Sequence, residues 1–171
     1  LDRPFKIIQL GGATDSSFLE GHSYTYEGSQ WGQIVDILMQ TKCMNPIIYF
    51  DELDKVSNTY KGQEIIGILT HLTDPSQNKH FHDKYFAGID IDLSKALIVF
   101  SFNDESKINK ILLDRIHTIN TKGYQNIDKI QISRKFLIPD IMENTGFNPE
   151  NIILSDNVIN YIINMYTKEE G

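Results

Sequence analysis

Short, mainly apolar runs recur along the first two thirds of the chain, at residues 5–10, 46–50 and 96–101, and the last two are continuous. Each run is rich in β-branched or aromatic residues, and polar residues or glycine follow it. A continuous apolar run of this length is typical of a strand that is buried on both faces, as in a parallel sheet beneath helices. The pattern therefore predicts three strands, the first of which ends at Gly11 and Gly12, where the backbone can turn sharply.

Between these runs, apolar residues recur at the spacing of a helix face. One helix is predicted from Trp31 to near Lys42. A second follows a polar loop at residues 57–62 and is stopped by Asp74 and Pro75. The apolar faces of the two helices are formed by Trp31, Ile34, Val35 and Leu38, and by Ile65, Ile66, Leu69 and Leu72.

A short helix is predicted at residues 107–113 and a last short strand at residues 117–120. Strands that alternate with helices favour a parallel sheet flanked by helices. The fold class predicted for this part of the chain is therefore α/β.

Beyond Gly123 the pattern predicts helices only. Residues 127–136 are helical, Pro139 interrupts or restarts the helix, and Ser155 is placed to cap a final helix. We therefore expect an α/β core at residues 1–122 and a small all-helical subdomain at residues 123–171.

The composition is that of an ordinary globular protein, with 40% hydrophobic and 23% charged residues among 171. A net charge of -7 argues against a general nucleic-acid or anionic-membrane surface. The single cysteine, Cys43, excludes an internal disulfide and fits a reducing, intracellular compartment. No apolar run is long enough to cross a bilayer, and the lack of an initiator Met leads us to expect a piece of a longer chain.

Two carboxylates, Asp51 and Glu52, follow the second strand directly. Parallel sheets bind their ligands at the carboxyl ends of their strands. One carboxylate there can hold Mg²⁺ while its neighbour orients or deprotonates a water, as phosphoryl transfer requires. A solvated acidic turn is the alternative interpretation. Asn103, just after the third strand, can lie beside the two carboxylates.

Two other segments carry residues of interest. Residues 21–32 are rich in glycine and tyrosine, and their rings favour packing on the domain over a gripping loop. His80, His82 and Asp83 can ligate zinc, but no further Cys or His cluster completes the coordination, so a metal site is disfavoured.

Taken together, the motifs resemble the ATPase module of Lon proteases, within the AAA+ superfamily of P-loop-type ATPases. The resemblance covers nearly the whole chain and keeps its order. It rests on Leu10-Gly11-Gly12, Gly21-His22, Asn45-Pro46, Asp51-Glu52-Leu53-Asp54-Lys55, Leu72-Thr73-Asp74-Pro75, Asp92-Leu93-Ser94, Leu112-Leu113-Asp114-Arg115, Gly123-Tyr124 and Leu137-Ile138-Pro139.

The resemblance implies ATP and Mg²⁺ as cofactors. Asp51 corresponds to the Walker B aspartate, which acts on Mg²⁺ largely through its waters, and Glu52 to the residue that polarises the attacking water. Asn103 lies at the sensor-1 position, with a loop cap as the alternative. Arg115 corresponds to the arginine finger, delivered to the nucleotide of the neighbouring subunit in a homo-hexamer. A surface ion pair with Asp114 is the alternative for Arg115.

The resemblance also implies pore loops that pull unfolded or damaged proteins inward. Tyr26 lies at the aromatic position of the first loop and Tyr60 in the second; an aromatic ring grips many sequences because it needs no specific hydrogen bond. The chain departs from the family at Glu27, where an aliphatic residue is usual, and at Trp31, where proline is usual. Glu27 is expected to weaken the hold on apolar substrates or to favour basic ones.

Several family elements are not in this sequence: the Walker A phosphate loop, the sensor-2 arginine and the protease domain with its Ser-Lys dyad. In the family strand order 5-1-4-3-2, the missing strand 1 leaves a slot between residues 96–101 and 117–120. We expect either an altered arrangement at that slot or a chain cut from a longer polypeptide, and we expect the chain alone to be inactive.

Three functions remain open from the sequence. The first is the unfoldase module of an ATP-dependent serine protease, located in the cytoplasm, the mitochondrial matrix or another organelle. The second is a non-catalytic Lon-like module for assembly or substrate binding. The third is an AAA+ unfoldase without protease activity.

Overall fold

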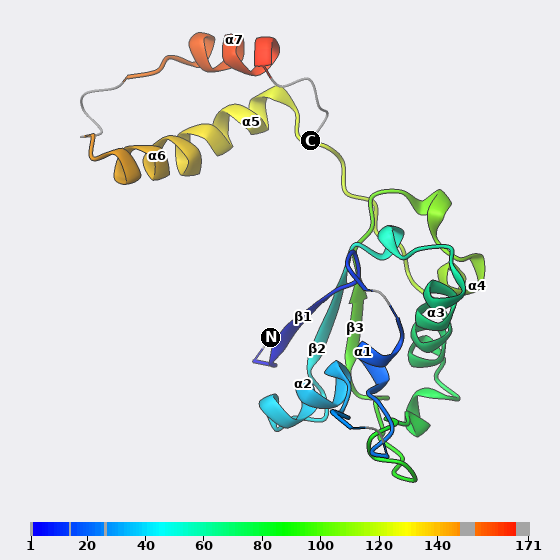
Figure 1. Ribbon diagram of the computed structural model, residues 1–171. Helices are drawn as coiled ribbons and strands as arrows, with labels where there is room; N and C mark the ends of the chain where they lie inside the picture. The colour runs from blue at the N-terminus through cyan, green and yellow to red at the C-terminus, as the bar shows by residue number, and fades with distance from the viewer. Residues whose placement is uncertain (1, 14, 26, 148–152, 167–171) are drawn as a thin grey trace. The chain divides into compact units, whose positions relative to one another are not determined.

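The computed structural model describes residues 2–13, 15–25, 27–147 and 153–166 (Figure 1). The chain divides into two compact units, Leu1–Thr118 and Ile119–Gly171. The first unit contains the sheet and the second contains helices only. None of the helices in the described part of the chain is long and apolar enough to cross a membrane.

A three-stranded parallel sheet forms the centre of the first unit. Its strands lie in the order β1 (Phe5–Gln9), β2 (Ile47–Asp51) and β3 (Leu97–Phe100) (Figure 1). Ile47 lies opposite both Phe5 and Leu97, so the three carboxyl ends meet at one edge of the sheet. The predicted parallel α/β architecture is confirmed.

The strand predicted at residues 117–120 is wrong, because this segment is irregular and pairs with no strand among the described residues. A strand is stable only when a neighbour satisfies its backbone groups. The neighbouring strand that the resemblance implies is not in this sequence, so the local preference of residues 117–120 for a strand has no ladder to join.

The two long helices of the first unit, α2 (Gln33–Thr41) and α3 (Tyr60–Thr73), connect successive strands. Right-handed connections that step in one direction across a parallel sheet place their helices on the same face. Accordingly, Ile8 of β1 is 1% exposed within the core, whereas its neighbour Ile7 on the opposite face is 56% exposed. The core cluster of this unit includes Ile8, Ile34, Val35, Leu38, Ile48, Phe50, Ile65, Ile66, Leu69 and Leu72.

Short helices complete the first unit: α1 (Ser17–Glu20), η1 (Leu53–Lys55), η2 (Asn78–His80), η3 (Glu105–Lys107) and α4 (Lys110–Leu113). Asp83, which is 1% exposed, holds the long loop before β3 in place by accepting hydrogen bonds from the backbone N–H of Gly32 and of Tyr85, both at 2.8 Å. The Trp31 ring packs on Tyr85 and Phe86, in agreement with the packing interpretation of that ring.

His80 and His82 both pair with Asp90, at 2.7 Å and 2.6 Å. Within the described ranges, no group of three or more His, Cys, Asp or Glu side chains is arranged to hold a metal ion. The two imidazoles therefore share one carboxylate across the exposed loop.

The second unit consists of α5 (Asn126–Ile132), a π-helical segment η4 (Ser133–Leu137), α6 (Ile138–Thr145) and α7 (Asp156–Tyr166). Pro139, near the start of α6, has no N–H to continue the hydrogen-bond pattern, and a π turn accommodates it without ending the helix. Arg134 pairs with Asp156 and ties η4 to α7. Among the described residues of this unit, the buried apolar side chains are those of Met142, Ile159 and Ile163.

Candidate functional site

Asp51 is the last residue of β2, and its carboxylate is fixed by the end of the neighbouring strand. The Oδ1 atom accepts hydrogen bonds from the Ser101 hydroxyl and, at 3.1 Å, from the Glu52 backbone N–H. Ser101 follows β3 and donates its own N–H to Phe50 at 3.0 Å. The candidate site therefore lies where β2 and β3 end side by side, as expected for a parallel sheet.

The backbone of Glu52 is left-handed, with φ 59° and ψ 48°. This conformation costs a non-glycine residue about 1–3 kcal/mol, and it turns the side chain away from the direction of β2. The carboxylate lies against Gly11, at the end of β1, and a Cβ added there would overlap the Oε2 atom of Glu52. Hydrogen bonds from Leu53 N–H to Ser101 O and from Lys55 N–H to Glu52 O stabilise the turn.

Asn103 lies at the same sheet edge, two residues beyond Ser101. Its backbone N–H points to Asp54 Oδ1 at 3.4 Å, and Asp54 is 7% exposed. The Asn103 side chain is exposed and has no hydrogen-bond partner in the part of the chain that the structure describes. The structure thus brings Asp51, Glu52 and Asn103 to one edge, with the Asn103 amide open to a ligand.

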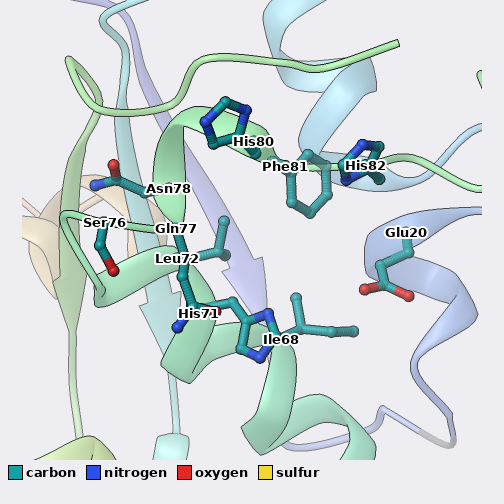
Figure 2. Close-up of a pocket in the computed structure, with 10 residues that line it drawn as sticks. All are labelled: Glu20, Ile68, His71, Leu72, Ser76, Gln77, Asn78, His80, Phe81 and His82. Atoms are coloured by element: carbon teal, nitrogen blue, oxygen red, sulfur yellow. The ribbon is translucent and has the colours of Figure 1, made fainter. Parts of the chain in front are cut away.

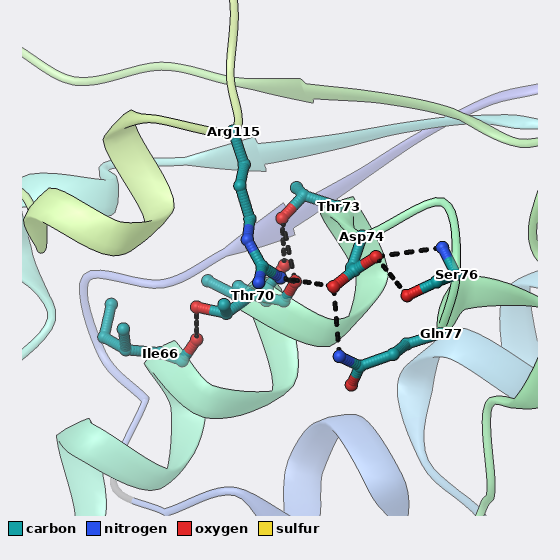
Figure 3. Close-up of polar contacts among 8 residues, drawn as sticks. Ile66, Thr70, Thr73, Asp74, Ser76, Gln77 and Arg115 are labelled. Atoms are coloured by element: carbon teal, nitrogen blue, oxygen red, sulfur yellow. Dashed lines mark hydrogen bonds and ion pairs between the residues drawn. The ribbon is translucent and has the colours of Figure 1, made fainter.

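Arg115 follows α4, and its contacts are with α3. Its Nη1 atom donates to the Thr70 carbonyl at 2.7 Å and lies 3.1 Å from Asp74 Oδ2 (Figure 3). The alternative prediction of an ion pair with Asp114 is wrong, because Arg115 pairs with Asp74. None of the contacts given for Arg115 among the described residues reaches Asp51 or Glu52.

Of the expected pore-loop residues, Tyr26 lies outside the described residues. Glu27 is exposed in a turn beside Gly28, whose φ is 77°. Tyr60 is 81% exposed. It lies in the first turn of α3, so the prediction that residues 60–62 belong to a loop is wrong. The helix begins there because Thr59 caps it, accepting a hydrogen bond from the Gly62 N–H at 3.3 Å.

A cavity of about 290 Å³ lies beside the C-terminal half of α3 (Figure 2). Its lining includes the apolar side chains of Ile68, Leu72 and Phe81 and the imidazoles of His71, His80 and His82. None of Asp51, Glu52, Asn103 and Arg115 lines it.

Sequence reasoning missed three contributors to this edge: Ser101, Asp54 and the close approach of Gly11 to Glu52. A serine that ends an apolar strand is the signal for Ser101, but its partner depends on the pairing of β2 with β3. Carboxylates in this arrangement can bind a hydrated Mg²⁺ and accept a proton from water, which is the chemistry expected for the site.

No family model matches this chain. The chain is 42% identical over 98% of its length to a Lon protease homolog of Acanthamoeba polyphaga mimivirus. It is 40% identical over its whole length to a peroxisomal Lon protease homolog 2 of Pichia angusta, and 37% identical to a Lon protease of Campylobacter concisus. The chain spans only a small part of each relative: 16% of the mimivirus protein, 18% of the Pichia angusta protein and 21% of the Campylobacter concisus protein.

The similarity runs through the segments that build the sheet edge as well as the helical unit, since the matches cover 98–100% of the chain. Identities near 40% over this length, repeated in relatives from a virus, a yeast and a bacterium, leave no doubt about common descent. This chain belongs to the Lon protease family.

Proposed function

We propose that the chain is the ATP-hydrolysing unfoldase module of a Lon-type, ATP-dependent serine protease. The observation that carries the proposal is the meeting of Asp51, Glu52 and Asn103 at one sheet edge, with Asp51 oriented by Ser101. Family membership supports the same function, because the relatives are named Lon protease.

Each residue of the edge has a distinct task in the proposed reaction. Asp51 Oδ1 is engaged by Ser101 and the Glu52 N–H, and its Oδ2 receives no hydrogen bond among the described residues, so Oδ2 is free to accept from the waters of Mg²⁺. Glu52 orients the attacking water and takes its proton, and the Asn103 amide holds that water or the γ-phosphate. Bound MgATP supplies the phosphoryl group that water attacks.

Arg115 completes the site from the neighbouring subunit of a homo-hexameric ring. An arginine that stabilises the charge of the transition state contributes on the order of 10³ to 10⁵ in rate. The sequence has no G-x-x-x-x-G-K-[S/T] motif, so the chain alone is inactive in this proposal, and its test uses the full-length protein.

The motion driven by hydrolysis acts on unfolded or damaged proteins through Tyr26 and Tyr60. The 81% exposure of Tyr60 supports this role, because an apolar ring of this size gains free energy by packing on a passing polypeptide.

Degradation of a labelled unfolded protein by the full-length protein tests the proposal. We expect degradation that requires ATP and that falls at least tenfold in Asn103→Ala, whose amide no longer holds the water or phosphate. ATP-dependent unfolding without cleavage would indicate an unfoldase without protease activity. Neither activity would indicate an assembly or substrate-binding module.

A further inference from the structure

The guanidinium of Arg115 is held at the C-terminal end of α3 (Figure 3). Nη1 donates to the carbonyl of Thr70, 45 positions away in the sequence, and pairs with the carboxylate of Asp74, the residue that caps α3. The side chains are only 31% exposed for Arg115 and 17% for Asp74, so solvent screens this pair less than a fully exposed one. A cation at this end of a helix also interacts favourably with the helix dipole.

Asp74 is itself fixed before it binds the arginine. Its Oδ1 accepts from the backbone N–H and the hydroxyl of Ser76, at 2.9 Å and 2.7 Å, and its Oδ2 accepts from Gln77 Nε2 at 3.0 Å (Figure 3). These bonds, the Ser76 hydroxyl first, hold the pKa of Asp74 below its usual range, and Arg115 lowers that pKa further. The carboxylate is therefore ionised at neutral pH, and three hydrogen bonds orient it.

The pairing with Arg115 is not a requirement of the local turn. Three other aspartates make the same bond to a serine two residues later, without an arginine: Asp15, Asp92 and Asp104. Asp74 differs from them because it also receives a cation from a distant part of the chain.

The pairing leaves the other donors of the guanidinium available. Within the described residues only Nη1 of Arg115 is hydrogen-bonded, so Nη2 and Nε remain for an anion. A guanidinium binds a phosphate best through two parallel N–H donors, which Nη2 and Nε can provide.

We propose that Asp74 is a positioning residue for Arg115 and fixes the guanidinium for the nucleotide of the neighbouring subunit; this inference rests on the proposed function. An unrestrained arginine loses about 2 kcal/mol of rotamer entropy when it is immobilised. Asp74 and Thr70 immobilise the side chain within its own subunit, so the cost is not incurred at the transition state.

The ATPase rate of the full-length protein tests this role. Asp74→Asn keeps the size of the side chain and its acceptor for Ser76 but removes the charge. We expect kcat to fall about tenfold with little change in KM for ATP, since a charge-assisted hydrogen bond is lost and the finger acts in the transition state. Asp92→Asn, in the same kind of turn without an arginine, is the matched control and is expected to keep the full rate.

A double-mutant cycle separates positioning from general damage to the fold. If Asp74 acts through Arg115, adding Asp74→Asn to Arg115→Ala lowers kcat no further. An Asp74→Asn enzyme at or above the wild-type rate would overturn the inference, as would a further loss of rate in the double variant.

The cycle also distinguishes this inference from the proposed function. A slow Arg115→Ala enzyme together with a normal Asp74→Asn enzyme rejects only the role of Asp74. A full ATPase rate in Arg115→Ala would show that Arg115 is not catalytic, and the role of Asp74 would fall with it. Whether the chain's site hydrolyses ATP is tested separately, by the ATPase rate of Glu52→Gln.

Discussion

At the scale of single residues, the site depends on contacts between strand ends. Asp51 is oriented by Ser101 from the next strand, and Glu52 is turned by its left-handed backbone toward Gly11. These contacts place two carboxylates in different surroundings, one held by donors and one exposed. That difference suits one carboxylate to Mg²⁺ and the other to proton transfer.

Gly11→Ala tests the placement of Glu52. The added Cβ overlaps the Glu52 carboxylate, which is the end of a flexible side chain, so we expect the ATPase rate to fall about tenfold or more while the melting temperature changes little. Gly12→Ala is the matched control, because a Cβ there meets no atom within 4 Å. Equal ATPase rates in the two variants would contradict the placement of Glu52.

The sequence predicts part of this site, and the reason lies in the range of the interactions. Asp51 and Glu52 are recognisable because they directly follow an apolar strand, and Asn103 and Arg115 because their motifs resemble a family. Ser101 and Asp74 are not recognisable as partners, because the Ser101 bond follows from the register of β2 and β3 and the Asp74 bond from the packing of α4 near α3.

At the scale of elements, helix α3 contributes to three features of the first unit: the exposed Tyr60, the hydrophobic core and the binding of Arg115. Its N-terminal turn carries Tyr60, its apolar face packs into the core, and its C-terminal end holds Arg115. Hydrophobic spacing predicts the core-facing residues of α3, but not where the helix begins, because the start depends on the Thr59 cap. The sequence does not predict the π turn at η4. A proline that starts a new helix and a proline accommodated within a continuing helix have the same sequence signal, and Pro139 is of the second kind.

Alanine substitutions at two glycines of α3 are predicted to change the stability of the protein in opposite directions. A Cβ at Gly62 would overlap the backbone carbonyl of Ser57, so Gly62→Ala is expected to destabilise the protein by about 1–3 kcal/mol. A Cβ added at Gly67 would have no neighbour within 4 Å, so Gly67→Ala is expected to stabilise the protein by about 0.5–1 kcal/mol. Chemical denaturation of both variants measures the two changes, and a Gly62→Ala protein as stable as Gly67→Ala would contradict the packing at the start of α3.

At the scale of the whole molecule, the chain joins an AAA+ α/β fold to a helical subdomain. The uncovered sheet face, marked by the 56% exposure of Ile7, and the lack of a partner for residues 117–120 show that the described residues alone do not complete a two-sided α/β layer. In the proposed ring, the exposed side chains of Glu27 and Tyr60 contact a passing polypeptide.

Glu27 offers a test of substrate handling by the ring. A negative charge next to the gripping aromatic position disfavours apolar segments and attracts basic ones. We expect Glu27→Ile in the full-length protein to speed the degradation of neutral unfolded substrates several-fold relative to basic ones. An unchanged ratio of the two degradation rates would contradict a role for Glu27 in substrate choice.

The most direct test of the central claim is the ATPase rate of the full-length protein carrying Glu52→Gln. A general base contributes about 10²–10⁴ in rate, so we predict at least a hundredfold loss of turnover with binding of ATP retained. Glu105→Gln, an exposed glutamate in η3, controls for the loss of one negative charge. Equal turnover in wild-type and Glu52→Gln proteins would contradict the account.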